Sequence, residues 1–300
     1  MFFGTPAFAL PSLVALHAAG HEIALVVTQP DRPAGRGQKT TPPPVAAYAH
    51  EQALPLWQTP SLRGEPADAV LRAANADVMA LAAFAELVPT NVLEMTRGGI
   101  LNVHPSLLPR WRGAAPIQSA LAAGDIETGV SIIRLVKELD AGPILLQERA
   151  PIAPEDDYVT LEPRLAAMGG ALLVRAVREQ PTPSPQDASL ATYSRRIERE
   201  DARIDWTEPS SAIFNKVRAY RGWPGAFTSF EARQLKILRA WPADGPAADP
   251  GSVEVALGVP LVATGAGWLR LDEIQLEGRR AMSGADLLRG YPGLARAKLA

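Results

Sequence analysis

The sequence contains no cysteine, no long apolar run and only a small excess of negative charge. Without cysteine, the chain forms no disulfide, no thiolate metal site and no cysteine nucleophile, which suits a reducing compartment. No stretch reaches the roughly 18 apolar residues that span a bilayer, and no charged-then-apolar leader opens the chain. We therefore expect a cytoplasmic protein with no membrane partner. A formal net charge of −2 over 300 residues argues against non-specific coating of nucleic acid.

Two common kinds of site are also not indicated. No Gly-x-Gly-x-x-Gly run follows a predicted strand, so a dinucleotide site is unsupported. His17 and His21 have a His-x-x-x-His spacing, but they fall in or beside a predicted helix that ends near Gly20 and we assign them no functional role, so we expect no metal. What remains is ordinary globular composition, with 47% hydrophobic and 21% charged residues. A chain of this length favours two domains over one core.

The first half of the chain alternates short apolar runs with helical patterns. This alternation predicts an α/β domain with an open, mainly parallel sheet. Strands are expected at about 2–3, 23–28, 77–82, 99–104, 128–135 and 144–147. Helices are expected at about 6–16, 45–52, 67–74, 89–95, 114–123 and 160–178.

The second half has a different pattern. Prolines alternate with polar residues at 180–186, which is typical of a semi-rigid linker. Beyond residue 203, one helix at about 209–220 precedes several short, closely spaced strands, which predict a small β-barrel. Residues 1–190 carry 14 Lys and Arg against 19 Asp and Glu, whereas residues 191–300 carry 16 against 13. We expect a catalytic domain at 1–184, a linker at 185–203 and a β-barrel domain at 204–300.

The most informative stretch is residues 102–113, which follow a predicted strand. Alternate residues of a strand share a face, so Asn102 and His104 project together. Pro105 and Pro109 bracket a short apolar turn whose shape proline largely fixes. An amide, an imidazole and a stiff apolar loop at a strand end suit acyl-type chemistry on a flat ligand.

This stretch resembles the signature of folate-dependent formyltransferases, in which an Asn and a His precede Ser-Leu-Leu-Pro and a later Gly. The partner element of that signature is Leu139-Asp140-Ala141-Gly142. The resemblance covers nearly the whole chain and is fullest for family members that formylate the methionine carried by initiator tRNA. It implies formyl-tetrahydrofolate as formyl donor, initiator methionyl-tRNA as acceptor, and an oligonucleotide-binding-like barrel in the C-terminal domain. We further expect a monomer.

Formyl transfer places specific demands on a site. An amine attacks the formyl carbon directly, a tetrahedral intermediate forms, and negative charge grows on the formyl oxygen. Hydrogen-bond donors must face that oxygen, and a group must move protons. Asn102 and His104 can donate, while Asp140 can orient the imidazole and accept a proton. The resemblance implies the same three residues as catalytic.

The apolar turn has two interpretations. Ser106 is an unsuitable nucleophile, because it lies outside any Gly-x-Ser-x-Gly elbow. The resemblance instead implies that Ser106, Leu107, Leu108 and Pro109 form a wall of the folate pocket. Leucine and proline suit a flat heterocycle, and backbone groups there can hydrogen-bond its edge.

A second candidate region is the long connection at 29–44, which we expect to lack regular structure. Arg32, Arg36 and Lys39 outnumber its one acid, and glycines flank Arg36. Without other information, a solvated basic loop is the simpler interpretation. The resemblance implies a loop that binds the tRNA acceptor arm. In the C-terminal domain, Arg218, Arg221 and Lys236 are weaker candidates for tRNA contact, proposed only from their charge.

Two alternatives stay open. A formyltransferase acting on a small amine, such as a nucleotide-linked sugar or a glycinamide ribonucleotide, would share the signature without needing the basic loop or the barrel. A catalytically inactive relative that only binds RNA or folate is the other alternative. The presence of Asn102, His104 and Asp140 counts against it.

Overall fold

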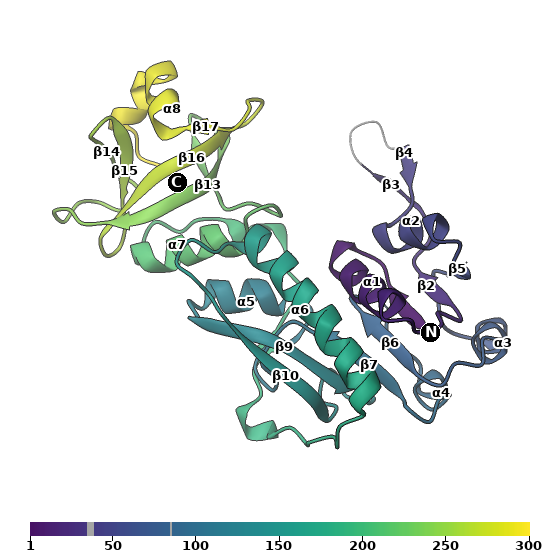
Figure 1. The fold of residues 1–300 in the computed structure, drawn as a ribbon. Coiled ribbons are helices and arrows are strands. Elements are labelled where there is room, and N and C mark those ends of the chain that lie inside the picture. Colours follow the sequence, from purple (N-terminus) through teal and green to yellow (C-terminus); the bar gives the residue numbers. More distant parts are fainter. Residues whose placement is uncertain (35–38, 85) are drawn as a thin grey trace. The chain divides into compact units, whose positions relative to one another are not determined.

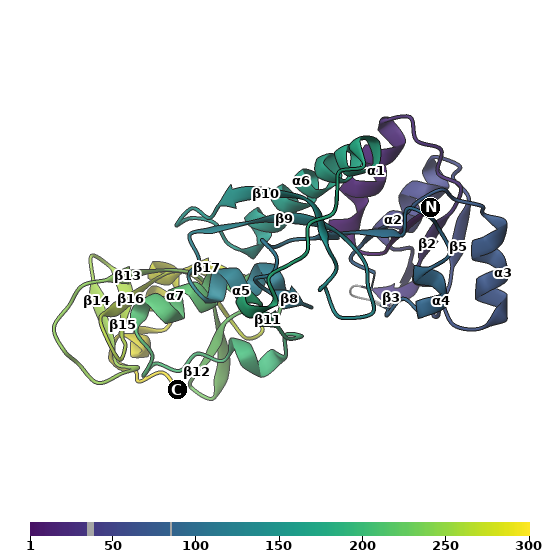
Figure 2. The same cartoon turned by 90° about the horizontal axis from the view of Figure 1, so that it is seen from below.

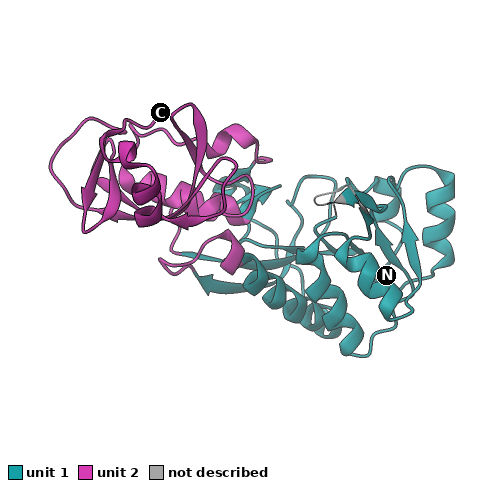
Figure 3. Ribbon diagram, turned by 90° about the horizontal axis from the view of Figure 1, so that it is seen from above, with its two compact units in different colours: residues 1–116, 127–151, 162–194 teal, residues 117–126, 152–161, 195–300 magenta. Residues whose placement is uncertain are grey.

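The computed structural model describes residues 1–34, 39–84 and 86–300 (Figure 1). Over these residues the chain divides into two compact units, which are described separately (Figure 3). Unit 1 comprises residues 1–116, 127–151 and 162–194, and unit 2 comprises residues 117–126, 152–161 and 195–300. Unit 2 therefore takes two short segments from the first 161 residues of the chain. The sequential domain boundaries given above stay a prediction.

Unit 1 is built on a seven-stranded sheet in the order β10-β9-β7-β6-β1-β2-β5. Its strands are β1 (Phe2–Gly4), β2 (Val26–Thr28), β5 (Leu56–Gln58), β6 (Met79–Ala82), β7 (Ile100–His104), β9 (Glu127–Arg134) and β10 (Ile144–Pro151). Neighbours from β7 to β5 are parallel, whereas β9 runs antiparallel to both β7 and β10. All residues of β1, β2, β6 and β7 are buried, as parallel strands covered on both faces should be. The predicted α/β fold class is confirmed.

Helices accompany this sheet, and the longest packs closely on it. They are α1 (Leu10–Ala18), α2 (Pro44–Glu51), α3 (Glu65–Ala73), α4 (Thr90–Leu93) and α6 (Tyr158–Glu179), with short 3₁₀ helices at Ala7–Ala9 and Ala188–Leu190. Two views show α6 alongside α1 (Figures 1 and 2). A Cβ at Gly169 would lie 2.5 Å from a methyl of Val103, and one at Gly170 would lie 2.7 Å from the Pro11 carbonyl oxygen. Gly169 therefore lets α6 pack against β7, the strand that carries the signature, and Gly170 lets it pack against α1.

The region at 29–44 differs from its expectation. It contains a short antiparallel hairpin, β3 (Arg32–Ala34) and β4 (Lys39–Thr41), so the prediction of a connection without regular structure was wrong. Strand β5 was also missed, because three residues are too few for an alternation to show. Strand β2 begins at Val26 rather than at residue 23, since its partner β1 starts at Phe2, opposite Val26.

Unit 2 is built on an antiparallel sheet in the order β12-β13-β16-β15-β14, with β17 paired to β16. Its strands are β12 (Phe227–Phe230), β13 (Arg233–Ala243), β14 (Val253–Ala256), β15 (Val259–Ala263), β16 (Trp268–Leu276) and β17 (Met282–Ser283). Its helices are α7 (Ser210–Ala219), α8 (Gly284–Gly290), most of α5 (Pro116–Ala122), and 3₁₀ turns at Arg199–Ala202 and Pro292–Arg296. In its core, the Trp206 indole N–H donates to the Thr228 hydroxyl at 3.0 Å.

The last residues of the chain join the two edge strands of this sheet. The Ser229 N–H donates to the Ala300 carbonyl oxygen at 2.8 Å, next to β12. The Leu299 N–H donates to the Gly251 carbonyl oxygen at 2.9 Å, next to β14. Leu299 is buried in the same core. The antiparallel sheet is therefore curled into a half-barrel, which confirms the predicted small β-barrel class of the second domain. Among the described residues, no helix has the length and apolar character needed to cross a membrane.

Candidate active site

Strand β7 places Asn102 and His104 at the carboxyl end of the parallel strands, where open α/β sheets hold their ligands. Asn102 pairs in register with Leu81 and Ile133, and His104 pairs with Ser131. Strand alternation turns both side chains to one face. Both are buried, at 7% and 4% exposure. Among the described residues, the Asn102 amide has no hydrogen-bonding partner. Its nitrogen and oxygen are not among the fully buried side-chain atoms that lack a partner, so the amide remains accessible to a ligand.

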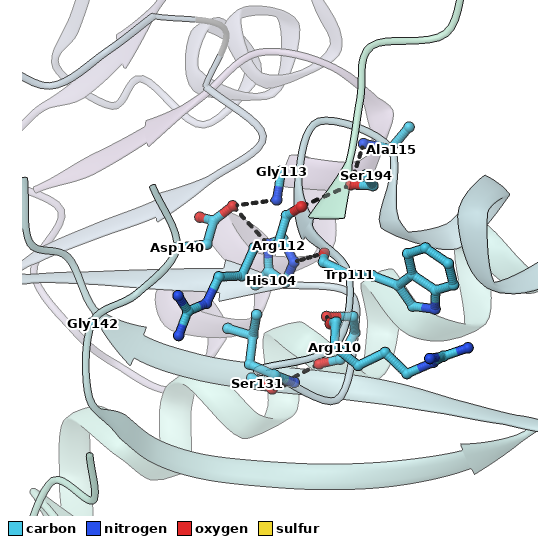
Figure 4. Close-up of polar contacts among 12 residues, drawn as sticks. His104, Arg110, Trp111, Arg112, Gly113, Ala115, Ser131, Asp140, Gly142 and Ser194 are labelled. Atoms are coloured by element: carbon cyan, nitrogen blue, oxygen red, sulfur yellow. Dashed lines mark hydrogen bonds and ion pairs between the residues drawn. The ribbon is translucent and has the colours of Figure 1, made fainter. Parts of the chain in front are cut away.

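The imidazole of His104 is held from two sides (Figure 4). Its Nε2 lies 2.9 Å from the carbonyl oxygen of Trp111. Because a carbonyl oxygen only accepts, Nε2 carries the hydrogen in this contact. Its Nδ1 lies 3.7 Å from Oδ2 of Asp140. The two halves of the signature therefore meet at this ring, as the proposed chemistry requires.

Asp140 lies in the turn between β9 and β10 and is held by the main chain of the other signature element. Its φ of +47° is in the left-handed region, which residues other than glycine rarely adopt. Its Oδ2 accepts a hydrogen bond from the Gly113 N–H at 2.8 Å. Gly142 follows closely, and a Cβ there would overlap the Arg134 carbonyl oxygen. The turn has no room for a side chain at that position, which explains its glycine.

The apolar loop after β7 uses most of its polar groups internally. The Ser106 hydroxyl donates to the Arg110 carbonyl oxygen at 2.6 Å, and Ser106 is fully buried. Its hydroxyl is thus committed to shaping the loop, in agreement with its rejection as a nucleophile. The Leu108 N–H donates to the Ser131 hydroxyl at 3.1 Å, and the Leu108 carbonyl accepts from the Gln147 amide at 3.0 Å.

These contacts change one expectation for the folate wall. Backbone groups of Ser106 and Leu108 are already engaged, because the Ser106 N–H donates to the His104 carbonyl oxygen at 2.9 Å. The Leu107 N–H, by contrast, has no partner among the described residues. Leu107 and Pro109 are half-buried, whereas Leu108 is buried. The loop therefore offers Leu107 and Pro109, rather than a row of free backbone groups, to a flat ligand.

A distant segment supports the same loop from its other end. Strand β8 (Arg112–Gly113) pairs in parallel with β11 (Tyr193–Ser194). The Trp111 N–H donates to the Thr192 hydroxyl at 2.9 Å, and the Arg112 N–H donates to the Thr192 carbonyl oxygen at 2.9 Å. The proline-rich stretch before it is also tied down, since Ser184 and Ile144 exchange two backbone hydrogen bonds at 2.8 Å. The stretch predicted as a linker is therefore attached to unit 1 at residue 184.

Sequence reasoning missed four polar supports of the site. Ser131 and Gln147 pin the loop, Thr192 holds its far end, and Gln186 contacts the Asp140 turn. Only Ser131 had a usable signal, because a serine that faces inward from an apolar strand needs a partner. The others donate to or accept from main-chain atoms far away in sequence, which leaves no pattern.

The basic candidates fall into separate groups. Arg32 lies on β3, is exposed, and donates to the Gln29 side chain at 3.3 Å. Lys39 begins β4, and Arg36 lies outside the described residues.

The three arginine and lysine candidates in unit 2 are used internally. Arg221 donates to the Leu238 carbonyl oxygen and pairs with Asp157 and Glu273, both at 3.1 Å. Lys236 donates to the Pro224 carbonyl oxygen at 3.0 Å.

Arg218 is likewise engaged, through carbonyl oxygens of the 153–156 turn and the Asn215 side chain. Burial lowers the pKa of this guanidinium from its usual range. These contacts assign Arg218, Arg221 and Lys236 a structural task. No group of three or more His, Asp or Glu side chains suited to a metal occurs in the part of the chain that the structure describes.

The fold and the comparisons with known proteins define a transferase of the formyl transferase kind. Residues 1–177 match the formyl transferase family model, and residues 196–292 match the model of the formyl transferase C-terminal domain. The chain belongs to the formyl transferase family. It is 46% identical over 298 residues to the methionyl-tRNA formyltransferase of Anaeromyxobacter sp. strain K, covering 96% of each chain. It is 48% identical over 295 residues to that of Gluconacetobacter diazotrophicus, covering 97% of this chain and 96% of the relative.

Solved structures share the fold at lower identity. A methionyl-tRNA formyltransferase from Clostridium thermocellum matches with a TM-score of 0.55 and 15% identity, covering 82% of this chain and 93% of that one. An N-formyltransferase from Helicobacter canadensis, in complex with folinic acid and dTDP-3-aminofucose, matches with a TM-score of 0.68 and 17% identity, covering 94% and 98%. At these identities the likeness concerns the fold.

Proposed function

We propose that this chain is an enzyme that transfers the formyl group of formyl-tetrahydrofolate to the amino group of methionyl initiator tRNA. The observation that carries the proposal is similarity over the full length. Relatives named methionyl-tRNA formyltransferase cover 96% of the chain, and both the catalytic and the C-terminal family models match. Such an enzyme acts in translation initiation, and we place it in the cytoplasm as a monomer.

Asn102, His104 and Asp140 form the proposed catalytic group. The free amide of Asn102 donates to the formyl oxygen as negative charge grows on it. The Nε2–H of His104 exchanges the Trp111 carbonyl for that same oxygen when substrate enters. Asp140 orients the ring and takes the proton released by the attacking ammonium group. The new bond joins the methionyl nitrogen to the formyl carbon, and the folate nitrogen leaves with a proton.

The loop after β7 supplies the proposed folate wall. Ser106 and Leu108 fix its shape from within, and Leu107 and Pro109 contact the flat ring. Gly129 lies beneath this loop, and a Cβ there would lie 2.5 Å from a methyl of Leu107. The Leu107 N–H remains for an acceptor on the ligand.

The proposed tRNA contacts belong to the segment between β2 and α2 and to unit 2. Arg32, Arg36 and Lys39 belong to the segment that leaves the carboxyl end of β2, the same sheet edge as His104. A segment rich in basic residues suits the phosphates of an acceptor arm. The excess of Lys and Arg over Asp and Glu in residues 191–300 suits the C-terminal domain to contact tRNA phosphates as well.

A formylation assay tests this function. Purified protein with formyl-tetrahydrofolate should formylate methionyl initiator tRNA, and tRNA retention on a filter should fall steeply as salt rises. A dTDP-amino sugar and glycinamide ribonucleotide serve as small-amine comparisons. Turnover of either small amine without turnover of tRNA would overturn the proposal in favour of the small-amine alternative. Binding of tRNA without any turnover would identify an inactive relative.

A further inference from the structure

Gln186 lies outside the signature but connects its two halves. Its Nε2 donates to the carbonyl oxygen of Asp140 at 2.8 Å and to that of Gly142 at 2.7 Å. Its Oε1 accepts from Nε and Nη2 of Arg112, at 3.0 Å and 2.7 Å. Both hydrogens and both lone pairs of the carboxamide are therefore used. Arg112 is 5% exposed and forms no ion pair with a carboxylate among the described residues.

These contacts close a ring around Asp140. Gln186 holds the main chain at Asp140 and Gly142, and it also holds the side chain of Arg112. The next residue after Arg112 is Gly113, whose N–H donates to the Asp140 carboxylate. The Asp140 backbone is thus linked through Gln186 to Arg112, and the Asp140 carboxylate is bound to the next residue, Gly113. A left-handed aspartate persists only where its surroundings hold it so, and Gln186 supplies two of those contacts.

We propose that Gln186 is a positioning residue for formyl transfer, which holds the Asp140 turn so that its carboxylate faces His104. The expected effect on kcat rests on the proposed function. The expected effect on the position of the Asp140 turn rests on the contacts alone. Glutamine is required because the position must donate to two carbonyl oxygens and accept from a guanidinium at once. A glutamate there would keep and strengthen the Arg112 contact but would repel both carbonyl oxygens.

The substitutions Gln186→Glu and Gln186→Met separate positioning from stability. In Gln186→Glu the stronger Arg112 pair offsets part of the lost contacts to the Asp140 turn, so the melting temperature falls less than in Gln186→Met. The kcat of Gln186→Glu falls on the order of 10- to 100-fold, because a small displacement of a catalytic group has that effect. The KM for methionyl-tRNA stays within about twofold, since no tRNA contact changes. Gln186→Met lowers both kcat and the melting temperature. The exposed Gln52→Glu serves as the matched control, with unchanged values.

A readout without turnover completes the test. The chain has four histidines, so ring ¹H–¹³C signals of His104 can be assigned by comparison with His104→Ala. Gln186→Glu should move the His104 signals and leave those of His17, His21 and His50 in place. If the wild type fails to formylate methionyl-tRNA, the proposed function is wrong. The His104 signals still test whether Gln186 positions the Asp140 turn. Unmoved His104 signals together with wild-type kcat in Gln186→Glu would overturn the inference. The inference would also be overturned if kcat in the two Gln186 variants fell only in proportion to their loss of melting temperature.

Discussion

The Nδ1 atom of His104 lies 3.7 Å from Oδ2 of Asp140, while Nε2 of the same ring lies 2.9 Å from the Trp111 carbonyl oxygen. One nitrogen faces a carboxylate from the turn after β9, and the other faces the loop after β7. Both ring nitrogens therefore have protein partners in the absence of substrate. In the proposed mechanism the Asp140 contact is kept, and the Trp111 contact is the one that the formyl oxygen replaces.

Replacing Asp140 with asparagine should abolish most activity while keeping the fold. The asparagine oxygen still accepts from the Gly113 N–H, but the negative charge beside His104 is lost. We expect kcat for formylation to fall on the order of 100-fold or more. Thermal denaturation should show a melting temperature close to that of the wild type. Full activity in Asp140→Asn would remove the carboxylate from the mechanism.

Replacing Asn102 with alanine should lower kcat by about 10²- to 10³-fold, as expected when one donor to a developing oxyanion is removed. Stability should change little, because this amide has no partner among the described residues. Asn91→Ala is a suitable control, since the Asn91 amide donates only to an exposed carboxylate of Asp68 at 2.7 Å. A large loss of stability in Asn102→Ala would show that the amide has a structural task instead.

Replacing Ser131 with alanine should loosen the folate wall. The Ser131 hydroxyl donates to the Ser106 carbonyl oxygen at 2.7 Å and accepts from Leu108 and Gln147. Loss of this buried junction should cost about 1–3 kcal/mol of unfolding free energy. The KM for formyl-tetrahydrofolate should rise more than that for tRNA, which steady-state kinetics with each substrate varied in turn would measure. Ser189→Ala, at an exposed position, should change neither KM.

Arg221 and Arg239 should respond differently to substitution by methionine. Arg221 is tied to Asp157, Glu273 and the Leu238 carbonyl, so Arg221→Met should cost about 2 kcal/mol of stability. Arg239 is exposed and has no partner among the described residues, so Arg239→Met should leave denaturation curves unchanged. If Arg239 contacts a tRNA phosphate, Arg239→Met makes the slope of log tRNA affinity against log salt concentration shallower by about one. Weaker tRNA binding with unchanged stability in Arg221→Met would contradict the structural task of that residue.

Much of the fold was predictable because its signals are local. Buried strands such as Met79–Ala82 show as continuous apolar runs, and Asn102 and His104 of β7 share a face by strand periodicity alone. That Asp140 meets His104 came from the family resemblance. No local pattern joins a turn after β9 to the end of β7.

The rest of the site depends on contacts without a sequence pattern. Gln186 follows a run of prolines whose composition indicates a linker, yet its amide reaches two main-chain carbonyl oxygens of the Asp140 turn. Thr192 acts through a hydroxyl and a carbonyl on residues about eighty positions earlier. The β3–β4 hairpin was missed because Pro33 and the flanking prolines and glycines indicate an irregular loop.

The pairing of β8 with β11 determines where this polypeptide can be recombined with a homologue. A chimaera that keeps the native support of its signature loop must have its crossover after Ser194. A crossover just beyond Glu179, where α6 ends, would leave Trp111 and Arg112 to be supported by foreign residues. For protein engineering, the unit to transfer therefore extends to Ser194, beyond the end of α6 at Glu179.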